Sequence, residues 1–316
     1  MTMQTAGIHH ITAFVGDVQR NADFYAGILG LRLVKKTINF DAPEVYHLYF
    51  GNEAGAPGTI ITFFPFSMGR KGRIGGGQVG ITTYVVPVGS FGFWEQRLAA
   101  YDIPVTKVTR IGEDYLSFAD YDGLRIELVE RAEGPQSAWS FGGVTAENAI
   151  KGFGGAVLYS TNPAHTADTL SRTLGLVQIA EGDGYIRYRS TADLGNIIDL
   201  KADPVPEGNG GKGTVHHIAW RAKDDAEQLD WGRLVQSHGY QPTPVQDRQY
   251  FNAIYFRETG GILFEIATDP PGFARDEAPD ALGEELMLPA WYEPHRAAIE
   301  ANLQPFEIRE IGVKQG

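Results

Sequence analysis

A strand-like stretch with two adjacent histidines occurs twice in this chain, at widely separated positions. The first copy spans residues 7–17 and the second spans residues 215–224. In each copy an aspartate follows the second histidine by seven residues, and a helical pattern follows that aspartate. Because the context recurs with the histidines, we interpret the two stretches as copies of one strand in a repeat fold. The pairs are His9–His10 and His216–His217.

Four units with the same predicted order, one strand, a helix and then three strands, fill most of the chain. β-branched and aromatic residues indicate the strands. Asp17 is predicted to cap the first helix, whose end, Leu29-Gly30-Leu31, recurs as Leu174-Gly175-Leu176. This order predicts an α+β fold of four βαβββ units. The units span about residues 7–66, 78–130, 153–202 and 213–268.

The length of 316 residues allows two domains of roughly 100 to 200 residues each. Residues 131–151 are rich in Gly, Ser and Glu and have no steady periodicity, which is typical of a linker. We therefore expect the units to pair into an N-terminal domain, residues 1–140, and a C-terminal domain, residues 152–316, with a C-terminal tail. Each domain would contain two consecutive units.

Composition excludes several classes of function. A formal charge of -12 argues against nucleic acid as a partner, because binding to phosphates depends on Lys and Arg. No apolar run approaches the roughly 20 residues of a membrane helix, so we expect a cytoplasmic protein without membrane contact. The chain has no cysteine, which leaves histidine and carboxylate as its strong metal ligands.

Strand alternation separates the two histidines of each pair, since neighbouring side chains point to opposite faces. Ile11, Ala13 and Val15 share the face of His9 and suit a buried core, so His10 is the better cavity residue. The same argument favours His217 over His216. In the last strand, Glu265 lies opposite a buried apolar stripe and needs a partner, because burying an unpaired charge is costly.

His10, His217 and Glu265 provide two neutral nitrogens and one carboxylate. This set leaves open positions on a non-haem Fe(II) and also suits Mn(II). A close spacing such as H-E-x-x-H is absent, and each histidine taken alone would be a structural residue, so the prediction depends on the repeat. Glu127 and Asp199 end the second and third units without a histidine, and we interpret them as structural or surface carboxylates. One metal per chain is expected, in a curved mixed sheet.

The four units and this ligand set resemble the vicinal oxygen chelate superfamily, which includes glyoxalases and extradiol dioxygenases. The chain is most similar to its ring-cleaving dioxygenases of the hydroquinone type. The resemblance covers nearly the whole chain. It is carried by Gly7-Ile8-His9-His10-Ile11-Thr12-Ala13, residues 21–37, Tyr46-His47-Leu48-Tyr49, Val215-His216-His217-Ile218-Ala219, Asp247-Arg248 and residues 261–269.

The resemblance implies that His10, His217 and Glu265 hold Fe(II). It also places five residues near the metal or the substrate as catalytic candidates: His9, Thr12, His216, Arg248 and Tyr255. Among them, Arg248 would stabilise negative charge and Tyr255 would exchange a proton. The alternatives are packed histidines, a surface ion pair for Arg248 and a core aromatic for Tyr255. His47 and the turn at residues 270–273 are further candidates for the pocket wall.

The predicted function is an Fe(II)-dependent, extradiol-type ring-cleaving dioxygenase that acts on a hydroquinone or a catechol with O2. Two alternatives remain. One is a glyoxalase-type isomerase or lyase, which usually gathers four protein ligands, whereas three strong ones are found here. The other is a metal-free protein that binds a small aromatic molecule. A homo-oligomer is the default expectation for such an enzyme.

Overall fold

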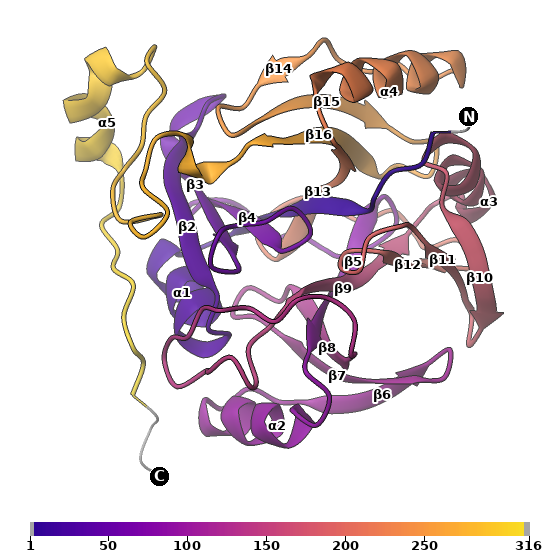
Figure 1. Ribbon diagram of the computed structural model, residues 1–316, viewed down its shortest axis with the longest axis horizontal. Coiled ribbons are helices and arrows are strands. Elements are labelled where there is room, and N and C mark those ends of the chain that lie inside the picture. The colour runs from indigo at the N-terminus through magenta and orange to yellow at the C-terminus, as the bar shows by residue number, and fades with distance from the viewer. Residues whose placement is uncertain (1–2, 313–316) are drawn as a thin grey trace.

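The computed structural model describes residues 3–312, which form two mixed sheets of eight strands each. Figure 1 shows one sheet above the other, with helices on their outer sides. The first sheet has the strand order β14-β15-β16-β13-β1-β4-β3-β2. Its strands are β1 (Ile8–Val15), β2 (Arg32–Asn39), β3 (Ala42–Gly51), β4 (Ile60–Pro65), β13 (Thr214–Ala222), β14 (Gln246–Asp247), β15 (Phe251–Arg257) and β16 (Leu263–Pro271).

The second sheet repeats this plan with the order β10-β11-β12-β9-β5-β8-β7-β6. In both sheets the two central strands are antiparallel to each other and parallel to their outer neighbours. Its strands are β5 (Gln78–Val86), β6 (Thr106–Arg110), β7 (Glu113–Ala119), β8 (Arg125–Glu130), β9 (Gly152–Tyr159), β10 (Val177–Gly182), β11 (Tyr185–Arg189) and β12 (Ile197–Lys201). The expected α+β fold of four units is confirmed.

The first sheet combines the first and fourth units, and the second sheet combines the second and third. Residues 131–151 therefore connect β8 to β9 within one sheet, and the chain passes between the sheets at residues 66–77 and 202–213. The sheets do not follow the expected division into residues 1–140 and 152–316, because the pairing of β1 with β13 joins distant parts of the chain. As a division into domains, it stays a prediction.

A helix follows the first strand of each unit, as predicted, but the α-helical parts of the first and third end before the predicted ends near Leu29 and Leu174. α1 and α3 continue as π-helical turns at Asp23–Ile28 and Thr169–Thr173. The predicted cap is confirmed, because the Asp17 carboxylate accepts the backbone N–H of Arg20 at 2.8 Å. The α-helices are α1 (Val18–Ala22), α2 (Phe91–Ala100), α3 (Pro163–Asp168), α4 (Asp225–Ser237) and α5 (Arg296–Asn302), with 3-10 turns at Phe273–Arg275 and Glu293–His295. Among residues 3–312, no helix is long and apolar enough to cross a membrane.

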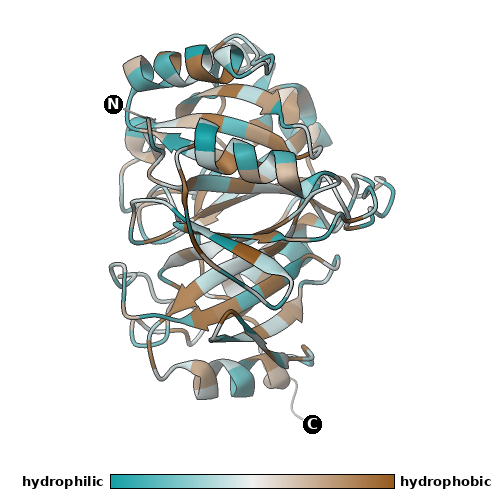
Figure 2. Ribbon diagram, turned by 90° about the vertical axis from the view of Figure 1, so that its right-hand side faces the viewer, coloured by the Kyte–Doolittle hydropathy of each residue, from teal (hydrophilic) through white to brown (hydrophobic). Residues whose placement is uncertain are grey.

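Hydrophobic and hydrophilic residues alternate along the strands of both sheets (Figure 2). The apolar faces pack against the helices around large, fully buried side chains, among them Tyr25, Trp94, Trp220 and Trp231. Burial of such aromatic side chains contributes much of the stability of a core. The remaining face of the first sheet is free to carry polar side chains.

Two β-bulges interrupt the pairing of the central strands in the first sheet. The first adds His9 to β1 and the second adds His216 to β13. A bulge re-aims side chains, so these two residues do not follow strand alternation. The paired residues on either side of the bulges are Ile8–Trp220, His10–Ala219, Thr12–His217 and Ala13–Val215.

Candidate metal centre

Three buried side chains meet on one face of the first sheet: His10 from β1, His217 from β13 and Glu265 from β16. The Nε2 atoms of the two histidines are 3.2 Å apart. They lie 3.3 Å (His10) and 2.8 Å (His217) from Oε2 of Glu265. The sequence therefore predicted correctly which side chains meet, although they come from opposite ends of the chain.

The electrostatics of these three residues fit a bound metal ion. Burial alone would raise the pKa of Glu265, but the two histidines lower it well below its usual value, so the carboxylate is ionised. Apart from these two imidazoles, neither of its oxygens has a hydrogen-bond donor among the described residues. A buried carboxylate with so few donors is costly, and a divalent cation between the three groups would remove that cost.

The histidine that precedes His10 and the one that precedes His217 each contact the ring of their neighbour. Nδ1 of His9 lies 2.9 Å from Nδ1 of His10, and Nδ1 of His216 lies 2.8 Å from Nδ1 of His217. The Thr268 backbone also accepts a hydrogen bond from the His9 ring, which leaves Nδ1 of a neutral His9 to accept a hydrogen bond from Nδ1–H of His10. In this arrangement the lone pair of His10 Nε2 faces His217 and Glu265, where a metal ion could be held.

The expectation that His9 and His216 point away from the site is therefore wrong. The two bulges turn each of them onto the side of its neighbour, where the ring nitrogens meet. His9 is buried, whereas His216 is exposed to the pocket beside the site. Of the two interpretations left open by the sequence, the structure supports contact with the ligands over simple packing.

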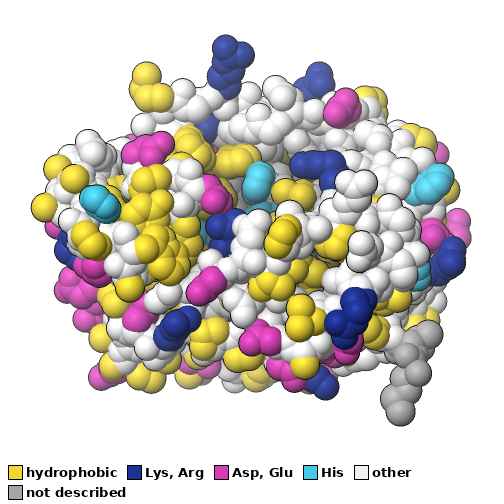
Figure 3. Space-filling model, turned by 90° about the horizontal axis from the view of Figure 1, so that it is seen from above, with side chains coloured by type: hydrophobic (Ala, Val, Ile, Leu, Met, Phe, Trp, Pro, Cys, Tyr) yellow, Lys and Arg dark blue, Asp and Glu magenta, His cyan; other side chains and the backbone are white. Residues whose placement is uncertain are grey.

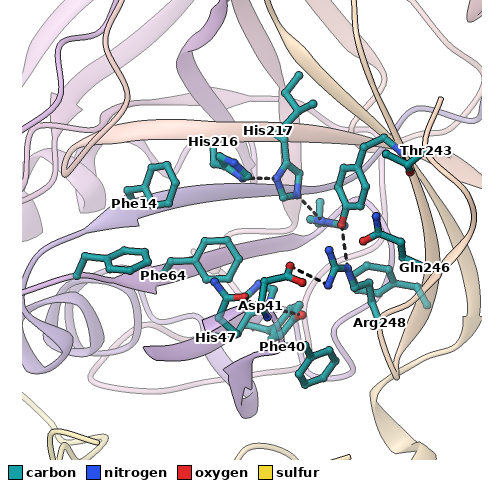
Figure 4. Close-up of a pocket in the computed structure, with 17 residues that line it drawn as sticks. Phe14, Phe40, Asp41, His47, Phe64, His216, His217, Thr243, Gln246 and Arg248 are labelled. Carbon is teal, nitrogen blue, oxygen red and sulfur yellow. Dashed lines mark hydrogen bonds and ion pairs between the residues drawn. The ribbon is translucent and has the colours of Figure 1, made fainter. Parts of the chain in front are cut away.

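A pocket of about 480 Å³ opens beside the three ligands. Figure 4 shows His216 and His217 above it, His47 below it, Phe14 and Phe64 on the left and Arg248 on the right. The surface is hollowed on the face seen from above, where histidine, basic and hydrophobic side chains gather (Figure 3). A volume of this order and mostly aromatic walls are typical of sites for small molecules.

Arg248 and Tyr255 lie together at this pocket, as predicted. The Nε–H of Arg248 donates to the Tyr255 hydroxyl at 3.2 Å, and Nη1 of Arg248 lies 3.1 Å from the carboxylate of Asp41. Burial raises the pKa of Tyr255, and Glu265 raises it further, so the phenol stays protonated at neutral pH. The alternative interpretation of Arg248, a surface ion pair, applies only to its contact with Asp41, which is exposed. Its contact with Tyr255 lies inside the pocket.

His47 and Tyr49 line the pocket, and sequence reasoning left both out of the catalytic set. The Tyr49 hydroxyl lies 2.8 Å from Nδ1 of His47, and Nε2 of His47 lies 2.8 Å from Oγ1 of Thr62. Thr62 in turn contacts the hydroxyl of Thr12 at 2.8 Å, so Thr12 reaches the pocket only through this chain of hydrogen bonds. The alternation of residues 46–50 was the one available signal, because it puts 47 and 49 on the same face.

Glu127 and Asp199 are buried in the second sheet and are not surface groups. Arg110 donates to both carboxylates, at 2.7 Å to the nearest oxygen of each. Arg187 donates to Asp199 as well. The structural interpretation of the two carboxylates is therefore correct, and the positive charge that they require is supplied by arginine.

The fold and this site agree with a sequence family. The model of the Glyoxalase/Bleomycin resistance protein/Dioxygenase superfamily matches residues 7–128 and 152–266, so the chain belongs to this superfamily. The two matched segments cover all four units. The resemblance drawn from the repeated histidine strand is thereby confirmed.

Individual relatives narrow the comparison. The chain is 61% identical over 311 residues to the "Putative ring-cleaving dioxygenase MhqO" of Bacillus subtilis, which covers 98% of this chain and 100% of the relative. It is 37% identical to the "Chlorohydroquinone/hydroquinone 1,2-dioxygenase" of Sphingobium indicum, over 89% of this chain and 91% of the relative. A crystal structure of a putative dioxygenase from Bacillus subtilis matches with a TM-score of 0.97, 61% identity and coverage of 98% and 100%.

Proposed function

We propose that this protein is an Fe(II)-dependent dioxygenase that cleaves the ring of a hydroquinone or a catechol with O2. The observation that carries the proposal is the convergence of His10, His217 and Glu265 beside a pocket with aromatic walls. Relatives named as ring-cleaving and hydroquinone dioxygenases support the same reaction class. Fe(II) is preferred over Mn(II) because two imidazoles and one carboxylate with open positions suit iron oxygenases.

Fe(II) held by these three residues would bring a phenolic oxygen and dioxygen side by side in one coordination sphere. The pocket supplies the orientation. Phe14, Phe64 and Phe66 provide flat apolar surfaces on which a single aromatic ring can stack. The polar groups lie at the metal end and at the Arg248 wall, so the hydroxyls of a diol have defined places.

The proposed proton acceptor is His47. Burial lowers the pKa of His47 well below its usual value, so the imidazole is neutral at neutral pH. Burial raises the pKa of Tyr49, whose hydroxyl therefore keeps its proton and donates to Nδ1 of His47. A proton that leaves a hydroxyl in the pocket can pass through the Tyr49 oxygen to this nitrogen, where the negative charge of Glu265 favours the protonated imidazole and partly offsets the burial that opposes it.

Arg248 and Tyr255 have the complementary role at the opposite wall. The Arg248 guanidinium carries a fixed positive charge, and the protonated Tyr255 hydroxyl can donate a hydrogen bond. Both groups would stabilise negative charge that develops on the ring oxygens during the reaction. His9 and His216 act through His10 and His217 by fixing the orientation of their rings.

The two alternatives receive less support. A glyoxalase-type isomerase or lyase would use a fourth protein ligand. The strand of the first unit that corresponds to β16 is β4, and its residue at the position of Glu265 is Thr62. The Thr62 hydroxyl is already bound to Thr12 and His47. A metal-free binder would give no reason for two imidazole nitrogens and a buried carboxylate to converge within 4.8 Å of one another.

The experiment is anaerobic loading with Fe(II), followed by addition of air and hydroquinone, methylhydroquinone or catechol. We expect oxygen uptake and a new absorbance from a ring-cleaved product with at least one diol. The Glu265→Gln variant should do neither, and Ala99→Phe on the outer helix α2 serves as a folded control. If no diol consumes oxygen while Fe(II) is bound, the proposed function is wrong.

A further inference from the structure

A second, smaller cavity of about 200 Å³ lies on the other side of His9 from the metal ligands. Two short segments form its walls, residues 54–57, which have small side chains, and residues 271–274, from which Phe273 reaches the floor. The turn at residues 270–273, expected as a wall of the substrate pocket, thus lines this separate recess. Ala54, Pro271 and Ala274 are exposed at its rim, whereas its floor is buried.

The polar groups that line the recess all have partners. His9 is bound to His10, and the Tyr250 hydroxyl donates to Asp276 at 3.0 Å. The Asp269 carboxylate is held by Arg221 at 2.7 and 3.0 Å. The rest of the floor is apolar, including Ile60 and Phe273. A polar ligand would find no free group here, so the recess is suited to a small apolar molecule.

Phe251 separates this recess from the substrate pocket, because its side chain lines both. Its ring centroid lies 5.2 Å from that of His9 and 4.9 Å from that of His10. A small molecule in the recess is therefore one aromatic side chain away from a metal ligand.

We propose that this recess takes up dioxygen and passes it by Phe251 to the metal centre. The inference rests on the proposed function. An aromatic substrate bound in the larger pocket occupies space beside the ligands, so a second entrance would let dioxygen reach the centre without passing the ring. Apolar gases enter apolar cavities that water leaves empty, and the recess offers such a surface next to His9 and Phe251, which both contact His10.

Xenon provides a test that does not depend on activity, because it is an apolar gas that diffraction can locate. Crystals of the metal-loaded protein under xenon pressure should show xenon among Ile60, Phe251 and Phe273. Absence of xenon from the recess would overturn the proposal.

A kinetic test uses Ala56→Phe and Ala274→Trp, which fill the recess from its two walls. Each should raise the KM for dioxygen several-fold and leave the KM for the diol unchanged, whereas Ala99→Phe on α2 should change neither. Two variants are used so that the test can still be made if one of them does not fold. If both fold, consume oxygen and keep the original KM for dioxygen, the recess has no role in gas entry. If even the unmodified protein consumes no oxygen, the proposed function fails instead.

Discussion

In the first sheet the central strands bring His10 and His217 together, whereas the equivalent positions of the second sheet hold Ile81 and Gly155. The register of the two central pairs establishes this equivalence, because Thr12 faces His217 in one and Thr83 faces Gly155 in the other. The bulges recur as well, at Gly80 and Gly154 in place of His9 and His216. The second sheet therefore keeps the backbone of the site and lacks its imidazoles.

The carboxylates show the opposite pattern. Asp199 occupies the position of Glu265, and Glu127 stands where the first sheet has Thr62. Arg187 lies across from Asp199 as Tyr255 lies across from Glu265, and with Arg110 it neutralises the pair. The difference teaches that a buried carboxylate in this fold needs positive charge, which arginine supplies in the second sheet and which the proposed metal ion would supply in the first.

The largest expected effect is the loss of metal binding and activity when a carboxylate of the first sheet is changed. Glu265→Gln should abolish stoichiometric metal binding and lower oxygen uptake at least about a thousandfold, because the only charged ligand is lost. The measurement is metal content by elemental analysis after gel filtration, with oxygen uptake alongside. Asp199→Asn is the matched control in the second sheet. Equal loss of metal in both variants would show that the two sheets do not differ in metal binding.

Removal of the Arg110 guanidinium should destabilise the second sheet without affecting metal binding by the first. Arg110→Met leaves Glu127 and Asp199 with fewer donors in a buried position, and breaking such a cluster costs about 3–5 kcal/mol. Urea unfolding with tryptophan fluorescence would measure the change. The account requires unchanged metal content per folded protein, so a folded variant that loses its metal would count against it.

The bulge histidines should have a smaller effect than the ligands. His9→Gln and His216→Gln should weaken metal affinity about 10- to 100-fold, since residues that orient a metal-bound histidine typically contribute this much. Competition with a chelator measures the affinity. His165→Gln in helix α3 is the control. Unchanged affinity in both variants would show that the Nδ1 contacts do not support the ligands.

The smallest effect concerns pH and Glu113, which extends the arginine cluster of the second sheet. Burial alone would raise the pKa of Glu113, but Arg131 and Arg187 lower it from 4.5 to about 2. Because the folded pKa is the lower one, this stabilisation is complete above about pH 4.5 and is lost as pH falls toward 2.

The measurement is the free energy of unfolding of the wild type and of Glu113→Gln between pH 6 and pH 3. We expect the difference between them to shrink as the pH falls. The control is Glu95→Gln, whose carboxylate pairs with Lys107 at the surface. A difference that stays constant or grows at low pH would contradict the assignment.

The sequence alone predicted which three side chains converge, because the same strand pattern occurs twice in the chain. His10 and His217 occur in matching contexts, and Glu265 ends the same unit as His217. Strand alternation selected the histidine of each pair that meets Glu265, but it wrongly predicted that the other two point away from the site. A bulge depends on the register between β1 and β13, and a single sequence contains no local signal for it.

The sequence also could not predict which residues contact His47 or which units pair with each other. His47 becomes part of the site through Tyr49 and Thr62, and the contact with Thr62 depends on how β3 and β4 pair. Likewise, consecutive units were the natural partners in sequence, but the first unit pairs with the fourth. Local patterns predict elements reliably, whereas contacts between distant strands require the structure.

The most direct test of the central claim is anomalous diffraction at the iron edge from crystals grown anaerobically with Fe(II). The account predicts a single ion between Nε2 of His10, Nε2 of His217 and the carboxylate of Glu265, and none between Glu127 and Asp199. An empty position at the three ligands, or an ion in the second sheet, would contradict it.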